Sequence, residues 1–365
     1  MHGAICCNHA QGQALGQASR RCEPSAEDSR PYLALGQMDQ IMRLAWPGRV
    51  STLLRMNPLF SILSKRTLWA VGALGLTASA IWANDKINVL VWDEQQPVPK
   101  KVYAHFPGNH VADHLKKNPR LNVTSANINQ PEQGLSTKAL DEADVLIYWG
   151  HVRHRDISEA KSQEIVDRIK TGKLGFVVLH SAHWSVPFMV AMQEVAAEAA
   201  LEQLPENLRA QVDVVYKGEL GWHMPKPDAR PYQLHEFRRG DDGQIRLLVE
   251  RPNCVFPRCC TPVQPSQVRI INKKHPITKG IPATFTIPET EMYDEPFHVP
   301  TPDEVILDET WEGGEYFRSG AIWSLGQGKV FYFRPGDQQY AVYKIGPVLK
   351  ILENAAIWLG AKAIH

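Results

Sequence analysis

The sequence lacks an excess of charge of either sign, and this absence excludes several classes of protein. Lysine and arginine together number 40, aspartate and glutamate 39, and the net charge at pH 7 is +1. The basic residues are spread along the chain and form no stripe of the kind that binds nucleic acid. No window is long and acidic enough to indicate a disordered tail, and no segment repeats. We therefore expect a folded chain that does not bind nucleic acid, and 365 residues suffice for one large domain or two small ones.

The sequence also lacks an apolar run of the roughly 20 residues that a membrane span requires. Residues 67–83 are apolar and small, follow a basic pair, and end near small residues that suit a cleavage site. This order is typical of a secretory signal peptide. Because a signal begins near the initiator, we expect translation to start at Met56, with 1–55 a non-native or disordered leader. Residues 56–85 would then be a signal peptide or an N-terminal anchor. We expect an exported protein, periplasmic or extracellular, that meets a membrane only if this segment is uncleaved.

Cysteine is scarce in the part that we expect to fold. Six cysteines are present, but three of them lie in the expected leader. The remaining Cys254, Cys259 and Cys260 are odd in number, so at most one internal disulfide forms among them. Their C-x4-C-C spacing is not a standard zinc pattern. We expect a stapled loop, with a metal role as the less favoured alternative.

Continuous apolar runs predict strands that are buried on both faces. Four such runs lie at 87–92, 121–128, 144–150 and 175–180. Helical spacing separates the runs, around 110–117, from Ser136, and over 158–170 with Ser158 as the N-cap. Because strands alternate with helices, we expect parallel pairing and an α/β fold with a doubly wound, mostly parallel sheet.

The second half of the chain predicts a change and then a return of this pattern. A helix is expected from Trp184 to about residue 204. Residues 205–267 carry many prolines, arginines and glycines with weak periodicity, and we expect an inserted irregular segment over one end of the sheet. Strands are expected again near Phe285 and Ile306 and at 321–325 and 329–333, before a closing helix at 343–359.

Histidines gather where two of the expected parallel strands end. His151 and His154 follow the third strand, and His180 and His183 follow the fourth. A doubly wound sheet binds its ligands beyond the carboxyl ends of its strands, so we expect these imidazoles to converge. Neutral imidazoles ligate zinc or a similar divalent metal, and a single histidine can act as a general acid or base. Packing in the core is the plain alternative.

A serine within the same turn raises the question of a nucleophile. Ser181 follows the fourth strand directly, as the nucleophile of a G-x-S-x-G turn would. The glycines that allow that strained turn are absent. We therefore expect Ser181 to cap the next helix or to orient His183, and regard a nucleophilic role as the least favoured interpretation.

A second group of polar residues lies in the segment 289–300, ETEMYDEPFHVP. Glu291 and Glu295 flank Tyr293 there, and such carboxylates can ligate a metal, orient an imidazole or act as a base. A solvated acidic loop is the alternative. After the last expected strand, Arg334 could pair with a carboxylate or hold a polyhydroxylated ligand, and Trp184 offers a flat face to a sugar ring.

Several pieces of the chain, taken together, resemble the ThuA family of trehalose-utilisation-like proteins. In order, they include VLVWDE, DVLIYWGHVRH, GFVVLHSAHW, HPITKGIP, EMYDEPFHVPTPDE and EGGEYFRSGAIWSLGQGKVFYFRPG. The resemblance covers residues 86–362 apart from the insertion, and implies a flavodoxin-like fold of the class I glutamine-amidotransferase type. Amidotransferases of that type carry a cysteine at the turn after the equivalent strand. Here that turn holds histidines and a serine, so glutamine hydrolysis by a cysteine is not available at that place.

The resemblance also assigns candidate roles to residues of this chain. We expect the ligands of a divalent metal such as zinc to be His151, His154 and His180. The candidate catalytic residues are His183, Glu291, Tyr293 and Glu295, and the candidate substrate-binding residues are His110, Trp184, Arg334 and Asp337. Asp337 departs from the family pattern, which often has a histidine after R-P-G.

These observations favour an exported enzyme of carbohydrate utilisation. The resemblance implies trehalose, a related disaccharide or a keto-sugar derivative as the partner, and hydrolysis or isomerisation as the reaction, with or without a metal. A non-catalytic sugar-binding or regulatory module is the alternative, and assembly into a homo-oligomer stays open.

Overall fold

The computed structural model describes residues 86–96, 102–220 and 235–361. The expected leader, 1–55, and the expected signal peptide or anchor, 56–85, lie outside the described residues. Within the described residues, no helix has both the length and the apolar character that crossing a membrane requires.

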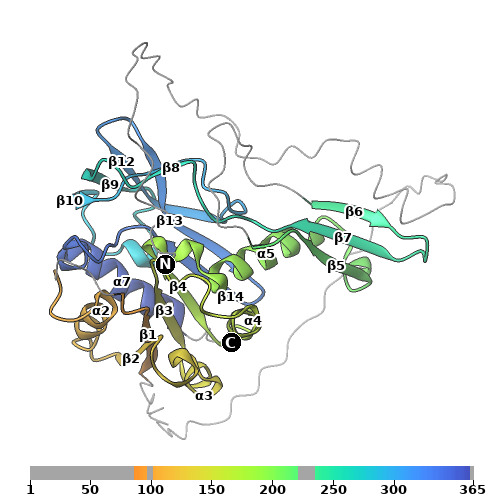
Figure 1. Cartoon of the computed structure of the whole chain (residues 1–365), viewed down its shortest axis with the longest axis horizontal. Coiled ribbons are helices and arrows are strands. Elements are labelled where there is room, and N and C mark those ends of the chain that lie inside the picture. The colour runs from red at the N-terminus through yellow and green to blue at the C-terminus, as the bar shows by residue number, and fades with distance from the viewer. Residues whose placement is uncertain (1–85, 97–101, 221–234, 362–365) are drawn as a thin grey trace, which may run out of the picture. The chain divides into compact units, whose positions relative to one another are not determined.

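A mixed sheet of nine strands forms the centre of the described part (Figure 1). Its order is β10-β9-β12-β13-β14-β4-β3-β1-β2. The strands from β14 to β2 are parallel to their neighbours on that side, and are β1 (Ile87–Asp93), β2 (Leu121–Asn127), β3 (Val145–Trp149), β4 (Gly175–Leu179) and β14 (Gly328–Phe333). The others pair antiparallel, and are β9 (Gln264–Ile270), β10 (Thr284–Thr290), β12 (Glu304–Trp311) and β13 (Tyr316–Leu325).

The parallel strands end in register. Asp93 of β1 is paired with Trp149 of β3. Trp149 is paired in turn with Leu179 of β4, and Leu179 with Phe333 of β14. The residues that follow these positions therefore leave the sheet along one edge, where a doubly wound sheet binds its ligands.

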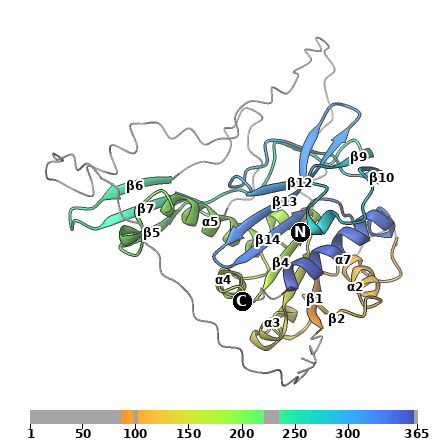
Figure 2. The same ribbon diagram turned by 180° about the vertical axis from the view of Figure 1, so that it is seen from behind.

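Helices cover both faces of the parallel half (Figures 1 and 2). One face carries α3 (Thr137–Glu142), α4 (Glu159–Lys170) and α5 (Val186–Leu201), and the other carries α2 (Pro107–Leu115) and α7 (Gly346–Gly360). Alternate side chains of each strand face the two layers. In β1, Leu90 and Trp92 join the core on the α4 and α5 side, whereas Val89 and Val91 join the core on the α2 and α7 side. Burial on both faces explains why these strands read as continuous apolar runs.

The expected α/β, doubly wound fold is confirmed. The parallel strands follow the order 2-1-3-4-5 when β14 is counted as the fifth, which is the flavodoxin-like order. The expected strands and helices are present. Ser158 caps α4 as expected, because its hydroxyl accepts a hydrogen bond from the amide of Lys161 at 3.2 Å.

The inserted segment 205–267 is more regular than expected. It contains α6 (Glu206–Arg209) and a small sheet in the order β5-β7-β6, made of β5 (Val212–Lys217), β7 (Ile245–Glu250) and β6 (His235–Arg239). Its last residues already belong to β9. Leu247 and Val249 of β7 pack against α5, whereas β5 alternates between half-buried and exposed residues. Such a partly exposed strand has no continuous apolar run, so its sequence signal is weak.

Candidate functional site

His180 is the residue at which β4 leaves the sheet. It begins a 3-10 turn, His180–Trp184, and its φ is +51°, in the left-handed region that non-glycine residues seldom adopt. The side chain is fully buried. Gly336 allows this placement, because a Cβ at Gly336 would lie 2.8 Å from the Cβ of His180. The hydroxyl of Tyr332 donates a hydrogen bond to the carbonyl oxygen of His180 at 3.0 Å. The strained conformation is thus held by its surroundings, as is common at functional sites.

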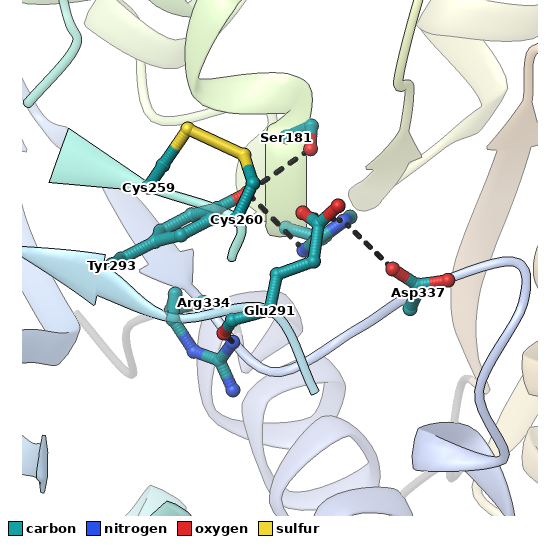
Figure 3. Close-up of a disulfide and its surroundings, with 8 residues drawn as sticks. Ser181, Cys259, Cys260, Glu291, Tyr293, Arg334 and Asp337 are labelled. Carbon is teal, nitrogen blue, oxygen red and sulfur yellow. Dashed lines mark hydrogen bonds and ion pairs between the residues drawn. A yellow bond between two sulfur atoms is a disulfide. The ribbon is translucent and has the colours of Figure 1, made fainter. Parts of the chain in front are cut away.

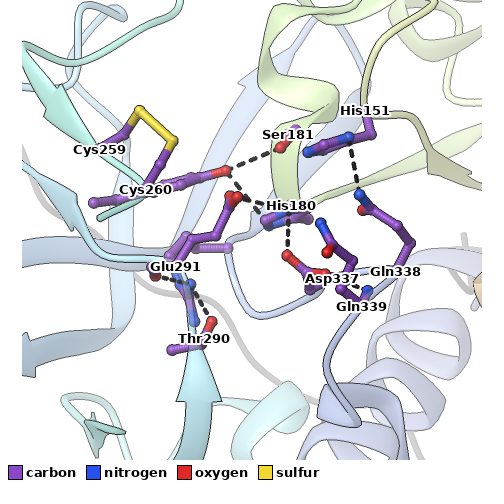
Figure 4. Close-up of polar contacts among 12 residues, drawn as sticks. His151, His180, Ser181, Cys259, Cys260, Thr290, Glu291, Asp337, Gln338 and Gln339 are labelled. Carbon is purple, nitrogen blue, oxygen red and sulfur yellow. Dashed lines mark hydrogen bonds and ion pairs between the residues drawn. A yellow bond between two sulfur atoms is a disulfide. The ribbon is translucent and has the colours of Figure 1, made fainter. Parts of the chain in front are cut away.

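Side chains from four chain segments meet around His180, and we call His151, His180, Glu291, Tyr293 and Asp337 the His180 cluster (Figure 4). The Nε2 atom of His180 lies 3.6 Å from Glu291 Oε2 and 3.8 Å from Asp337 Oδ2. Its Nδ1 atom lies 3.4 Å from the hydroxyl of Tyr293. The ring of His151 stacks on that of His180 with centroids 5.6 Å apart.

The inner members of the His180 cluster are sealed, and the outer members reach solvent. His180, Tyr293 and Asp337 are buried, whereas His151 and Glu291 are partly exposed, with 12% of the Glu291 side chain accessible. A small molecule would therefore approach the cluster at His151 and Glu291.

Burial dominates the electrostatics of the His180 cluster. It lowers the pKa of His151 to about 4 and also lowers the pKa of His180, so both imidazoles are neutral at pH 7. Burial raises the pKa of Glu291 and of Asp337, and the mutual repulsion of the two carboxyls adds to the effect at Glu291. Neutral imidazoles beside carboxyl groups can move protons or ligate a metal.

Two glutamines that sequence reasoning missed contact His151. The Nδ1 atom of His151 lies 2.9 Å from Gln96 Oε1 and 3.3 Å from Gln338 Nε2. Glu94 holds the same turn, because its carboxylate accepts hydrogen bonds from the amides of Val152 and Arg153. The only sequence signal for the glutamines is that each follows the end of a parallel strand.

The second histidine of each H-x-x-H pair lies outside the cluster. His183 Nδ1 is 2.5 Å from the carbonyl oxygen of Cys254, and aromatic rings surround the side chain, so burial lowers its pKa to about 3. The ring of His154 packs against Trp184 with centroids 6.1 Å apart. The atoms able to hold a metal together, within 4.8 Å of one another, come from His151, His180 and Glu291. Glu291 therefore stands where we had expected His154.

Arg334 does not have the substrate-binding geometry that we expected from the sequence. It is fully buried, and its guanidinium forms an ion pair with Glu309 through Nε and Nη2, both at 2.5 Å. Its Nη1 donates to Thr290 Oγ1 at 2.9 Å and to the carbonyl oxygen of Glu291 at 3.0 Å. Arg334 is therefore a positioning residue for the segment that carries Glu291.

Glu295 is also engaged elsewhere. Arg318 donates to its carboxylate from Nε at 2.8 Å and from Nη2 at 3.0 Å. The amides of Phe297 and Arg318 donate to the same carboxylate. With its oxygens bound in this way, Glu295 lacks the geometry of the free base that the sequence suggested.

Ser181 departs from both expected roles. Its hydroxyl lies 3.0 Å from the hydroxyl of Tyr293 (Figure 3), and the next helix, α5, is capped by Ser185. Of the remaining candidates, Trp184 lies beside His154 and His183, and His110 of α2 lies beside Tyr103 with ring centroids 5.2 Å apart. Neither of these two belongs to the group that meets at His180.

The late cysteines staple the segment that carries Tyr293. Cys259 and Cys260 form a disulfide, and Cys254 is free and buried, in agreement with the expectation of at most one internal disulfide (Figure 3). Cys259 belongs to β8 (Arg258–Cys259), which pairs with β11 (Tyr293–Asp294). The amide of Cys260 donates to the carbonyl oxygen of Met292 at 2.6 Å. The insertion thus holds the segment that presents Glu291 and Tyr293.

Comparison with known proteins identifies the family. The model of the ThuA family, described as trehalose utilisation, matches residues 88–359. Two solved structures of putative ThuA-like proteins are similar. That from Bacteroides uniformis ATCC 8492 is 17% identical with a TM-score of 0.45, covering 77% of this chain and 94% of that one. That from Parabacteroides merdae ATCC 43184 is 13% identical with a TM-score of 0.48, covering 76% and 91%.

A putative GMP synthase protein from Thermoplasma acidophilum is also similar, with 9% identity, a TM-score of 0.33, and coverage of 74% of this chain and 92% of that one. Comparison with curated proteins gave no match. The family match runs from β1 into α7 and includes every segment of the His180 cluster. The chain therefore belongs to the ThuA family, whose description is trehalose utilisation.

Proposed function

We propose that this protein is an enzyme that hydrolyses or isomerises a disaccharide of the trehalose class, or a keto-sugar derived from one, at the His180 cluster. The observation that carries the proposal is the state of His180. It is fully buried, its backbone is left-handed, and its Nε2 atom has no hydrogen-bond partner among the described residues. Buried polar atoms are nearly always paired, so an unpaired one beside two carboxyl groups points to chemistry at that atom.

The groups of the cluster suit the proposed reactions. Hydrolysis of a glycosidic bond and isomerisation of a keto-sugar both move a proton to or from an oxygen or a carbon next to it. Carboxyl, imidazole and hydroxyl groups are the side chains that move such protons. Glu291 and His151 reach solvent and would meet the sugar first, with Tyr293 behind them.

The charges of the cluster favour a neutral sugar over a phosphorylated one. Phosphate groups are recognised by arginine and lysine side chains that are free to pair with them. Among the described residues, the arginine next to the cluster is Arg334, and Glu309 already pairs with it in the interior. A polyhydroxylated, uncharged ligand fits the remaining carboxyl, imidazole, amide and hydroxyl groups.

A thiol or serine nucleophile is less consistent with these contacts. Cys254 is buried, and burial raises the pKa of its thiol, which makes it a poor nucleophile. The hydroxyl of Ser181 contacts that of Tyr293, and no histidine activates it within the described part of the chain. The histidine at the turn after β4 is therefore the centre of the proposed site.

The proposal predicts a specific loss of turnover in Glu291→Gln. The full chain is incubated with trehalose and with its 3-keto derivative, and products are followed by chromatography. We expect turnover of at least one of them, reduced about 100-fold or more in Glu291→Gln, because one positioned acid–base group contributes about that factor. Glu289→Gln is the matched control, because Glu289 is an exposed residue of β10 two positions away.

Two outcomes contradict the proposed function. One is binding of the sugars by the wild-type protein without any turnover, which would indicate the sugar-binding module. The other is equal turnover in Glu291→Gln and Glu289→Gln, which would remove the His180 cluster from the reaction.

A further inference from the structure

We propose that His151, His180 and Glu291 bind one divalent transition-metal ion of the zinc class. Each residue offers one ligand atom, and the three atoms lie within 4.8 Å of one another. Zinc holds nitrogen and oxygen ligands at about 2.0–2.2 Å, so its ligand atoms lie about 3–4 Å apart. His180 Nε2 and Glu291 Oε2 are already 3.6 Å apart. Small side-chain movements complete the site.

An independent observation at His180 points to a ligand. Its Nε2 atom is completely buried and has no hydrogen-bond partner among the described residues. Its other ring nitrogen, Nδ1, lies 3.4 Å from the hydroxyl of Tyr293. When Nδ1 carries the proton and donates it to that hydroxyl, Nε2 presents a lone pair toward Glu291. This division of the two nitrogens is usual for a metal-binding histidine.

His151 is oriented in the same way. Its Nδ1 atom lies 2.9 Å from Gln96 Oε1, an atom that can only accept a hydrogen bond. Nδ1 therefore carries the proton in this arrangement, and Nε2 keeps its lone pair. The amide of Gln96 fixes the ring from behind, as amide or carboxyl oxygens commonly do for metal-ligating imidazoles.

Asp337 balances the charge of the proposed site. Its Oδ2 atom lies 3.8 Å from His180 Nε2, is buried, and has no hydrogen-bond partner among the described residues. Two neutral imidazoles, Glu291 and Asp337 together carry two negative charges when both carboxyls are ionised, which neutralise a divalent ion. Two histidines with a glutamate are a known zinc set, whereas calcium and magnesium take oxygen ligands only.

The site deepens the proposed function without depending on it for its detection. Its catalytic meaning rests on the proposed function, because a bound divalent metal polarises a sugar oxygen or makes hydroxide from water near pH 7. Metal binding itself is measured in the absence of any sugar. Failure of either inference can therefore be recognised separately.

The test uses the full chain without a histidine tag, stripped with a chelator and titrated with Zn²⁺ and with Co²⁺. We expect one ion per chain by elemental analysis and a visible Co²⁺ absorption band. Affinity should fall at least tenfold in His151→Ala, in Glu291→Gln and in His180→Asn. Asparagine is chosen at residue 180 because it tolerates the left-handed backbone there. Circular dichroism checks that each variant is folded.

Two matched controls separate this site from the alternatives. Glu289→Gln repeats the glutamate substitution on the exposed face of β10, and His154→Ala removes a neighbouring buried histidine. Both should bind the metal as the wild type does. Absence of Zn²⁺ and Co²⁺ binding at millimolar concentration in the wild type would overturn the proposal. So would loss of binding in His154→Ala with full binding in Glu291→Gln. Sugar turnover that survives complete chelation would count against a catalytic metal and leave the proposed function standing.

Discussion

Arg334 is fully buried, and Glu309 holds its guanidinium through two nitrogens. The guanidinium also lies over the rings of Tyr293 and Trp311, 5.6 and 5.4 Å from their centroids. Its third nitrogen binds the backbone of Glu291. A single buried ion pair thus links the last strands of the sheet to the segment that presents two members of the His180 cluster.

This arrangement predicts a large loss of stability in Arg334→Met. Removing one partner of a buried ion pair leaves the other charge without compensation, which costs about 3–5 kcal/mol. We expect the free energy of unfolding in urea to fall by about that amount. Adding Glu309→Gln to the same chain should restore part of the loss, because the buried charge is then removed while Ser266 and Ser319 keep an acceptor.

Arg238→Met is the matched control, because Arg238 pairs with Glu236 on the surface and both side chains are more than half exposed. We expect no measurable change in its free energy of unfolding. Equal stability of Arg334→Met and Arg238→Met would contradict the positioning role that we assign to Arg334.

At the scale of elements, Asp93 joins the end of β1 to the start of α2. Its Oδ2 accepts a hydrogen bond from the amide of Gly108 at 2.5 Å, and its Oδ1 accepts one from the amide of Gln95 at 2.5 Å. Burial nevertheless raises the pKa of Asp93 to about 7, because the cost of desolvating the charge exceeds the effect of the two hydrogen bonds. Glu94 and Tyr343 are the titratable groups that also act on it or feel its charge.

Asp93 therefore predicts a pH dependence of stability. Between about pH 4 and pH 7 the folded state keeps a proton that the unfolded state has lost, so the contribution of Asp93 to stability falls as the pH rises. The full change is at most about 4 kcal/mol and is complete above pH 7. In Asp93→Asn this component is absent, and urea unfolding at several pH values should show the variant gaining on the wild type over that interval. Two parallel stability curves would contradict the raised pKa.

The elements that sequence reasoning could predict are those whose pattern is local. β1, β3 and β4 are buried on both faces, so their apolar runs identify them. β5 and β6 lie in a small sheet with partly exposed faces, and their pattern is weak in a segment rich in proline and glycine. Their existence depends on packing against α5, which no local pattern reports.

At the scale of the whole molecule, the fold predicted which strand ends would meet, and the sequence supplied the candidate side chains. His151, His180, Glu291, Tyr293 and Asp337 could all be named before the structure. The sequence could not separate them from His183, Glu295 and Arg334, because that distinction depends on partners far away along the chain. Cys254, Arg318 and Glu309 are those partners.

The measurement that tests the central claim most directly is a crystal structure of the full chain with trehalose or its 3-keto derivative bound. The account predicts sugar density at the His180 cluster, with hydroxyl groups within hydrogen-bond distance of Glu291 and His151, the members that reach solvent. Density for the sugar at another surface, such as the sheet of β5, β6 and β7, with none at the His180 cluster, would contradict it.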